Sequence, residues 1–161
     1  MKEPAFAPME LRHLPQVLEI EKHSFPTPWS KRAFEGEIRH NRFAHYYVCL
    51  LEKKVAGYAG MWLILDEAHI TNIAVAREFR GLDFGKRMLL FLMQQTLLHG
   101  ADKMTLEVRP SNLTARELYK GMGFAEAGVR KGYYTDNNED AIIMWKHLLM
   151  DIEGIDDEVK G

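Results

Sequence analysis

Apolar and polar residues alternate along several segments of the chain, which is the pattern of half-buried β-strands. The clearest case is segment 103–109, where Met104, Leu106 and Val108 fall on one face and Glu107 falls on the other. The same pattern, interrupted by short polar turns, predicts six more strands, over residues 6–11, 43–52, 55–65, 68–76, 124–129 and 141–149.

Between these strands, apolar residues recur three and four positions apart, which predicts helices. The first helix carries Leu14, Val17, Leu18 and Glu21 on one face, and its first turns form an apolar stripe. It ends in segment 25–29, because two closely spaced prolines cannot continue a helix. Ser30 is well placed to cap a second helix that runs to about residue 40.

Two more helices are predicted in the second half of the chain. One follows Gly85 with Leu89 and Leu92 on its apolar stripe, and Gly100 is placed to end it. The other begins near Asn112 and has Tyr119 on its stripe. The order of elements predicts an α+β fold, a three-layer arrangement of a mixed, mostly antiparallel sheet with flanking helices. We expect a single domain over residues 1–150 and an acidic tail over 151–161.

The composition is typical of one globular domain, since 161 residues are enough to bury a core and 47% of them are hydrophobic. A net charge of −2 gives no overall attraction to nucleic acid or to an anionic membrane. No apolar run approaches the roughly 18 residues of a membrane span, and the N-terminus lacks the long apolar segment of a signal peptide. We expect a soluble cytoplasmic protein, a monomer or weak dimer, that makes no direct contact with nucleic acid or membrane.

Cysteine and histidine usage gives no support to a thiol nucleophile or a metal site. Cys49 is the only cysteine, so no internal disulfide can form. It lies in the apolar run 46–51, which is typical of a buried small side chain. The seven histidines are scattered without ligand spacing, so we expect no metal.

The segment 72–87 carries the strongest chemical signal. It reads as a strand, a turn from Arg80 to Gly85, and the start of an amphipathic helix. Such a turn directs backbone amides and a helix N-terminus at one point, which suits a pyrophosphate, and Arg77 and Lys86 add positive charge. Taken alone, the segment also fits an ordinary strand-to-helix connection with a solvated basic rim.

Three polar residues further along the chain have both a chemical and a structural interpretation. Glu107 is either a general base or a solvent-facing carboxylate on a strand. Tyr119 is either a proton donor or a core residue with a tethered hydroxyl, and Asn112 is either a ligand contact or a helix cap. Spacing alone does not decide between these interpretations.

Taken in order, the motifs resemble the GCN5-related N-acetyltransferase (GNAT) superfamily. More narrowly, they are similar to its RimI type, the ribosomal-protein alanine N-acetyltransferases. The resemblance covers the chain from about Met9 to about His147, and the correct order of many weak motifs makes it specific. Its markers are segments 25–29, 65–68, 72–75, 106–109, 111–112, 118–119, 123–124, 133–134 and 139–144.

The resemblance implies the GNAT fold, with acetyl-CoA as cosubstrate and no metal. In that family the strand equivalent to residues 72–75 pairs its backbone with the pantetheine arm, and an amide there can support the thioester oxygen. The turn after it holds the pyrophosphate. The implied cofactor contacts are Ile73, Ala74, Val75, Arg80, Gly81, Leu82, Asp83, Phe84, Gly85, Lys86, Asn112 and Tyr119.

The resemblance also implies the chemistry, with Glu107 as general base and Tyr119 as general acid. The acceptor would be the N-terminal alanine α-amine of a small-subunit ribosomal protein. It would enter between two aromatic loops, at residues 25–29 and 133–138. The implied acceptor contacts are Phe25, Trp29, Glu67, Asn72, Tyr133 and Tyr134.

One position departs from the family pattern. The turn of the superfamily usually has a glycine where this chain has Asp83. A carboxylate near a pyrophosphate is unfavourable, and aspartate lacks the backbone freedom of glycine. We expect the Asp83 side chain to face solvent while its amide still serves, with somewhat weakened cofactor affinity.

Two alternatives stay open at this point. The first keeps the chemistry and widens the acceptor to several protein N-termini, to internal lysines or to a small amine. The second is a non-catalytic module that binds acetyl-CoA. Asp83 favours the second alternative, while the presence of both Glu107 and Tyr119 argues against it.

Overall fold

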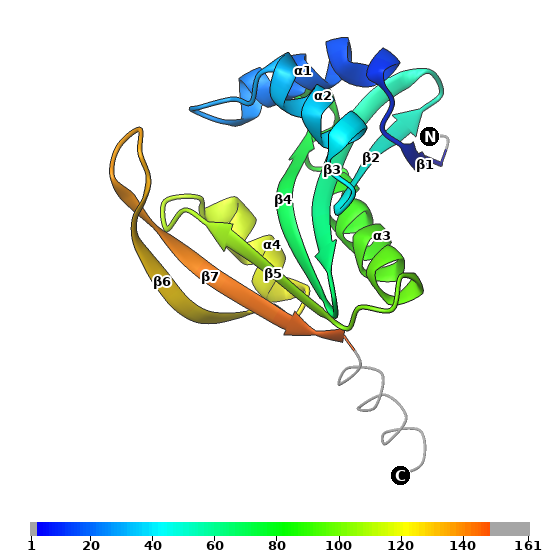
Figure 1. The fold of residues 1–161 in the computed structure, drawn as a ribbon. Coiled ribbons are helices and arrows are strands. Elements are labelled where there is room, and N and C mark those ends of the chain that lie inside the picture. Colours follow the sequence, from blue (N-terminus) through cyan, green and yellow to red (C-terminus); the bar gives the residue numbers. More distant parts are fainter. Residues whose placement is uncertain (1–2, 149–161) are drawn as a thin grey trace. The chain divides into compact units, whose positions relative to one another are not determined.

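A computed structural model describes residues 3–148 as a mixed sheet with flanking helices (Figure 1). The strands are β1 (Ala5–Pro8), β2 (Ala44–Leu51), β3 (Lys54–Ile64), β4 (Glu67–Val75), β5 (Lys103–Val108), β6 (Ala125–Tyr134) and β7 (Glu139–His147). The helices are α1 (Leu14–Ser24), α2 (Lys31–His40), α3 (Phe84–Leu98) and α4 (Leu113–Gly121), with 3-10 turns η1 (Leu11–His13) and η2 (Arg77–Phe79).

The strands form one seven-stranded sheet in the order β1-β2-β3-β4-β5-β7-β6. The pairs β1–β2, β2–β3, β5–β7 and β6–β7 run antiparallel, whereas β4 and β5 run parallel. This mixed, mostly antiparallel sheet with flanking helices confirms the predicted fold class. No helix within residues 3–148 is long and apolar enough to cross a membrane.

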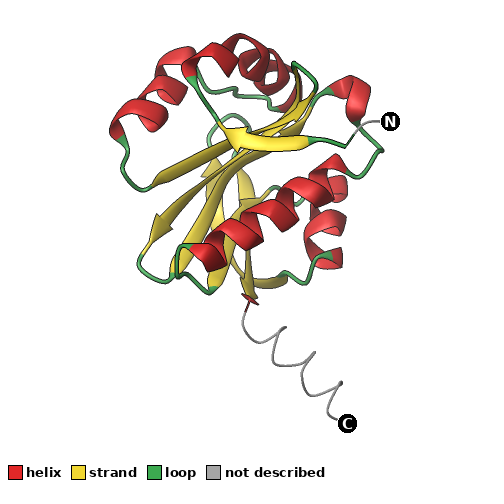
Figure 2. Ribbon diagram, turned by 90° about the vertical axis from the view of Figure 1, so that its right-hand side faces the viewer, coloured by secondary structure: helices red, strands yellow, loops and turns green. Residues whose placement is uncertain are grey.

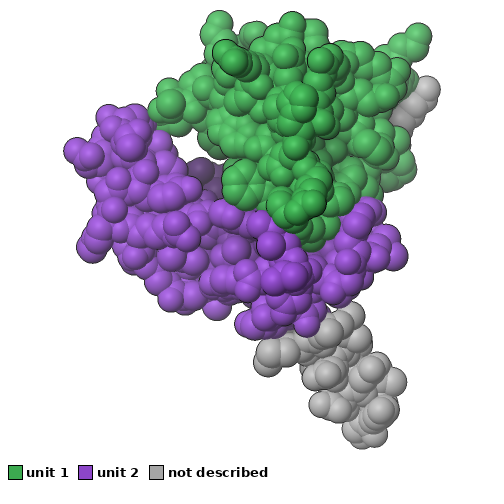
Figure 3. Space-filling model, viewed as in Figure 1, with its two compact units in different colours: residues 1–63, 70–92 green, residues 64–69, 93–161 purple. Residues whose placement is uncertain are grey.

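The chain divides into two compact units (Figure 3). Unit 1 contains the residues up to 63 together with 70–92, and unit 2 contains residues 64–69 together with those from 93 onward. The predicted single domain over 1–150 stays a prediction. The predicted acidic tail over 151–161 lies outside the described residues.

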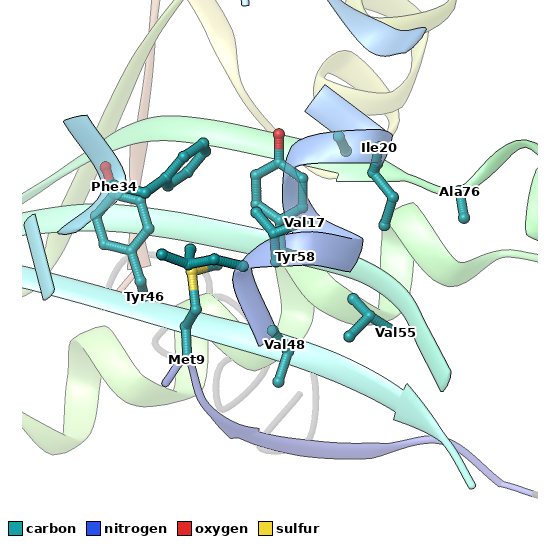
Figure 4. Close-up of a cluster of buried hydrophobic side chains, with 11 residues drawn as sticks. Met9, Val17, Ile20, Phe34, Tyr46, Val48, Val55, Tyr58 and Ala76 are labelled. Atoms are coloured by element: carbon teal, nitrogen blue, oxygen red, sulfur yellow. The ribbon is translucent and has the colours of Figure 1, made fainter. Parts of the chain in front are cut away.

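In unit 1, helices cover both faces of the strands, as the ribbon shows (Figure 2). On one face, Tyr46 and Val48 of β2 join a buried cluster with Val17 of α1 and Phe34 of α2 (Figure 4). Tyr47 points to the other face, where its ring meets Phe91 of α3 at 5.0 Å. Strand alternation thus divides the side chains of β2 between two helical layers.

Helix α3 approaches the sheet closely at a glycine of β3. A Cβ atom added at Gly57 would lie 2.8 Å from the Ala74 carbonyl oxygen and 3.0 Å from the Met88 side chain. Both distances are too short for a side chain to fit without rearrangement. Gly57 therefore permits the packing of α3 behind β3 and β4.

In unit 2, β5 has the predicted alternation. Met104, Leu106 and Val108 are buried, whereas Glu107 falls on the opposite, less buried face. Its neighbours are the start of β4, paired at residues 67–69, and the whole of β7. Helix α4 packs on this unit through Tyr119, whose ring lies 5.8 Å from that of Phe124.

The predicted helix ends are confirmed by their hydrogen bonds. The Ser30 hydroxyl accepts the Ala33 N–H at 3.1 Å, and the Asn112 side-chain oxygen accepts the Ala115 N–H at 3.2 Å. Gly100 has a φ of +86°, the left-handed conformation that ends a helix. The structural interpretation of Asn112 as a cap is therefore correct.

Two predicted strand ends were wrong. Strand β6 continues to Tyr134 instead of stopping at residue 129, and β1 stops at Pro8 before a 3-10 turn. The last part of β6 is almost wholly exposed, so no apolar alternation marks it. Pairing with β7, such as Arg130 with Ala141, extends the strand regardless.

Candidate active site

The predicted phosphate-binding turn lies between β4 and α3 in unit 1. Gly81 and Asp83 both have left-handed backbones, with φ values of +79° and +66°. The first helical hydrogen bond joins the Arg87 amide to the Asp83 carbonyl at 3.0 Å. The amides of residues 84–86 therefore precede the helical ladder, and the helix N-terminus is electropositive. Asp83 is exposed, in line with the expectation that its side chain faces solvent.

Arg80, at the start of this turn, is held by two hydrogen bonds. Arg80 folds back, donating from Nε to the Val75 carbonyl oxygen and from Nη2 to the Ser24 hydroxyl, both at 3.2 Å. Val75 and Arg80 also line a cavity of about 310 Å³, together with Lys54 and Arg77. Glu19 and Glu78 line the same cavity, and Glu78 pairs with Lys54 at 2.6 Å. Two of the predicted cofactor contacts thus border a cavity with charges of both signs.

The predicted acceptor segment 25–29 begins where α1 ends. The ring of Trp29 packs against Phe34 at 5.3 Å and Tyr46 at 6.3 Å. Its exposed side borders a cavity of about 650 Å³ that is also lined by Trp62. Phe25 packs against the hydrophobic cluster of unit 1. Both aromatic residues therefore anchor the segment to the core.

A buried polar network lies beneath this segment, and its centre is Glu21. The carboxyl group of Glu21, a residue only 1% exposed, accepts hydrogen bonds from the Tyr58 hydroxyl, the Asn72 amide and the Trp29 backbone N–H. Burial raises the pKa of Glu21. Asn72 also accepts a hydrogen bond from the Tyr46 hydroxyl at 3.3 Å.

This network bears on one predicted acceptor contact. The Asn72 side chain is buried and already bonded within the protein on both its amide nitrogen and its oxygen. Sequence reasoning placed Glu21 on the apolar stripe of α1 and gave it no role. The one feature of the sequence that could have indicated a role for Glu21 is an acidic residue at a position that faces the core.

In unit 2, Glu107 lies at a meeting point of three elements. Its side chain is 8% exposed, although it belongs to the less buried face of β5. Its Oε2 atom lies 2.5 Å from Nε2 of His69, at the start of β4. Its Oε1 atom lies 3.6 Å from Nε of Arg130 on β6. The two carboxylate oxygens of Glu107 therefore have different partners.

His69 and Arg130 were not predicted as site residues. Position 69 pairs with Thr105 in the parallel register of β4 and β5, two residues before Glu107. The alternation of both strands places His69 and Glu107 on the same side, but only the register shows that they meet. Arg130 lies in the part of β6 that the sequence did not predict as a strand.

Tyr119 is the other residue predicted to act in catalysis. It is 6% exposed, and its pKa is raised chiefly by burial and further by the neighbouring Tyr134. The phenol therefore keeps its proton at neutral pH. A proton-bearing hydroxyl is what a general acid requires.

The predicted aromatic pair at the end of β6 is held by an ion-pair network. The Arg109 guanidinium lies 3.9 Å from the centre of the Tyr134 ring, and it bonds to Asp136 and Glu139. Glu139 also accepts the backbone N–H of Ser111 at 2.9 Å, and hydrogen bonds at Ser111 lower its pKa to about 2. The turn between β6 and β7 is thereby fixed to the segment that follows β5.

The remaining predicted residues lie on the surface or in the core. Tyr133 is 44% exposed, with its ring 5.0 Å from that of Tyr134. Glu67 is exposed at the start of β4. Cys49 is buried, which raises its pKa to about 11 and confirms the expected structural character. Among residues 3–148, no three His, Cys, Asp or Glu side chains are grouped to hold a metal ion.

Each unit gathers part of the predicted set. In unit 1, the Glu21 network joins Trp29 of the acceptor segment to Asn72. Asn72 directly precedes the predicted cofactor strand 73–75, and the turn 80–86 follows that strand in the chain. In unit 2 the start of β4, Glu107, Tyr119 and the pair Tyr133 and Tyr134 belong to one sheet and its helix.

Comparison with known proteins gives consistent matches over most of the chain. The model of the acetyltransferase (GNAT) family matches residues 14–124. A Bacillus subtilis protein with the provisional name ribosomal protein bS18-alanine N-acetyltransferase is 44% identical over 85% of this chain and 91% of its own length. The ribosomal protein bS18-alanine N-acetyltransferase of Escherichia coli K12 is 36% identical over 84% of this chain and 92% of its own.

A solved structure agrees with these sequence matches. The crystal structure of the ribosomal-protein-S18-alanine N-acetyltransferase from Escherichia coli superimposes with a TM-score of 0.82 at 33% identity. The match covers 90% of this chain and 94% of that chain. The similarity therefore extends across both units.

Proposed function

The chain belongs to the acetyltransferase (GNAT) family and is an N-acetyltransferase, and from this premise we propose its acceptor and its catalytic residues. It transfers the acetyl group of acetyl-CoA to the N-terminal alanine α-amine of a small-subunit ribosomal protein. The named activity of the matched relatives supports this acceptor, since they are alanine N-acetyltransferases of ribosomal protein bS18.

Glu107 carries the proposal. An amine attacks a thioester only after it loses a proton, and Glu107 is a nearly buried carboxylate on a strand with one oxygen beside a histidine. A protein α-ammonium has a pKa of about 7.7–8.0 against about 10.4 for lysine. A carboxylate, acting directly or through water, therefore removes the α-ammonium proton near neutrality far more easily.

The remaining steps use two more features of the chain. A backbone amide of residues 73–75 stabilises the oxygen that becomes negative when the amine attacks the acetyl carbonyl. As the carbon–sulfur bond breaks, Tyr119 gives its proton to the departing sulfur. The second proton that the attacking nitrogen must lose then restores the phenol. The Tyr119 phenol is protonated beforehand, since even an unshifted tyrosine has a pKa of about 10. No covalent acyl-enzyme is required, which suits the buried Cys49.

The turn after β4 fits the pyrophosphate of acetyl-CoA. Its left-handed residues and the amides of 84–86 provide backbone donors, and Lys86 is exposed beside them. Arg77 adds positive charge in the neighbouring cavity, whereas Lys54 there is paired with Glu78 at 2.6 Å. Asp83 is the unfavourable exception, and its exposure limits the repulsion.

Thiol release from acetyl-CoA with two matched peptides tests the proposal. One peptide has a free N-terminal alanine and no lysine, and the other has a blocked N-terminus and one internal lysine. We expect turnover with the first peptide alone. Turnover with the second alone would make the enzyme a lysine acetyltransferase. No turnover with either, despite acetyl-CoA binding, would contradict the proposed acceptor.

A further inference from the structure

We propose that His69 is a positioning residue for Glu107, holding its Oε2 atom so that Oε1 is presented to the acceptor amine or to the water that carries its proton. This inference rests on the proposed function, because it assumes that Glu107 is the base. It adds a residue that the catalytic assignment does not contain.

The contact itself is short and partly protected from water. Nε2 of His69 lies 2.5 Å from Oε2 of Glu107, and the two side chains are 32% and 8% exposed. Both residues lie on neighbouring parallel strands within unit 2, where the register pairs His69 with Thr105. Strand pairing fixes the backbone on both sides, so the contact does not depend on a loop.

The chemistry of the pair specifies which atom carries the hydrogen. A base must be ionised to act, and an ionised carboxylate has no proton to donate, so in the proposed role of Glu107 the hydrogen of this contact belongs to Nε2. The imidazole therefore donates to Oε2, and a hydrogen bond to an ionised acceptor is among the stronger kinds. Oε2 is engaged, and Oε1 is the oxygen left for proton transfer.

The partner of Oε1 is held much less tightly. Nε of Arg130 lies 3.6 Å from it, beyond ordinary hydrogen-bond distance, and the Arg130 side chain is 57% exposed. Exposed ion pairs of this kind contribute little and exchange readily with water. The asymmetry between the two oxygens is what a positioned base requires, with one oxygen anchored and one accessible.

A double-mutant cycle tests this role. The variants are His69→Ala, Glu107→Gln and the combination, with acetylated N-terminal alanine peptide quantified by mass spectrometry. We expect His69→Ala to lower kcat about tenfold, with little change in KM for acetyl-CoA. In the Glu107→Gln background the same substitution should cost less than about twofold, because there is no longer a carboxylate to orient.

A conservative variant separates positioning from a general structural role. The amide of His69→Gln places an N–H near the position of the imidazole Nε2, so we expect it to restore kcat to within about threefold of wild type. A loss of the same size for His69→Ala in both backgrounds would overturn the inference while leaving Glu107 as base. No loss in either background would also overturn it.

The outcome also separates this inference from the proposed function. If Glu107→Gln keeps full activity, the assignment of Glu107 as base fails, and the role of His69 fails with it. If Glu107→Gln is inactive but His69→Gln is no better than His69→Ala, only the positioning role of His69 fails.

Discussion

Glu21 in unit 1 and Glu107 in unit 2 are both carboxylates removed from water, yet their surroundings differ in kind. Neutral donors surround Glu21, namely a tyrosine hydroxyl, an asparagine amide and a backbone N–H. Glu107 has partners that can carry positive charge, His69 close by and Arg130 further away. The first carboxylate joins α1, the acceptor segment, β3 and β4, whereas the second joins three strands.

Under the proposed role of Glu107, burial alone does not distinguish a catalytic base from a structural carboxylate. Both oxygens of Glu21 accept hydrogen bonds from groups fixed in the core, so the carboxyl group is committed to the fold. Glu107 has one oxygen beside a long, exposed contact. The proposal therefore rests on how loosely Arg130 is held beside Oε1 of Glu107, more than on the burial of that carboxylate.

The largest effect is expected at Glu107. Glu107→Ala should lower turnover with the N-terminal alanine peptide by about 10² to 10⁴, because the amine then loses its proton only to bulk water. Thiol release in steady state measures this loss. Glu117→Ala, at an exposed position of α4, is the control and should leave turnover unchanged. Wild-type turnover in Glu107→Ala would mean that Glu107, like Glu21, contributes to the fold and not to the chemistry.

Tyr119→Phe should also lower turnover, by roughly 10² to 10⁴, since the sulfur then leaves without a proton donor. The ring is retained, so packing against Phe124 at 5.8 Å should persist. The matched control is Tyr47→Phe, which removes the hydroxyl of another tyrosine whose pKa is raised by burial. The Tyr47 ring packs against Phe91 in unit 1, and no catalytic role is proposed for it. Equal activity losses in the two variants would point to destabilisation instead of proton transfer.

Glu21 is expected to affect stability more than chemistry. Glu21→Ala leaves three donors, two of them in buried hydrogen bonds, without their acceptor and should lower the free energy of unfolding by about 3 kcal/mol. Urea denaturation measures the change. Glu19→Ala, on an exposed turn of the same helix, removes only a surface pair with His23 and should cost less than about 1 kcal/mol. Similar values for both variants would show that the network contributes nothing beyond helix propensity.

The raised pKa of Glu21 gives this stability a pH dependence of known sign. Folding favours the protonated carboxyl group, so the folded state binds more protons than the unfolded state above pH 4.5. The Glu21 contribution to the free energy of unfolding therefore falls as pH rises from 4.5 through the higher pKa of the folded state.

Glu21→Gln removes that titration, so the stability difference between wild type and variant should move against wild type as pH rises. Urea denaturation at a series of pH values from about 4 to 7 measures it. A difference that stays constant over this range would mean that Glu21 titrates alike in both states.

Much of the fold was predictable from local patterns. The alternation of apolar and polar residues correctly predicted which side chains of β5 are buried. The helix caps at Ser30 and Asn112 could be predicted because their side chains accept hydrogen bonds from backbone amides of the first helical turn. The end of β6 was not predictable in this way. Its residues are exposed, so only pairing with β7 extends the strand.

In the candidate site, too, residues marked by a local sequence pattern could be predicted, whereas residues defined by contacts distant in the sequence could not. Glu107 could be predicted as a site residue because its position in an alternating strand and its family motif are both local. His69 was not, because its contact depends on a register between strands that are 38 residues apart at these positions. Glu21 was overlooked because an acidic residue on an apolar stripe gains meaning only when Tyr58 and Asn72 lie next to it.

Asp83 provides a third, exposed carboxylate, and the smallest expected effect. Its φ of +66° is a conformation that glycine adopts at lower cost, and its charge lies in the turn proposed for the pyrophosphate. Asp83→Asn removes the charge and keeps the shape, while Asp83→Gly also relieves the backbone. We expect acetyl-CoA to bind about threefold more tightly to Asp83→Asn and up to about tenfold more tightly to Asp83→Gly, as measured by calorimetry.

The gain in Asp83→Asn should shrink at high salt, because an exposed charge is screened. Weaker binding by both variants would mean that the carboxylate itself contributes to the cofactor site, and exposure would then be no guide to which carboxylates are inert.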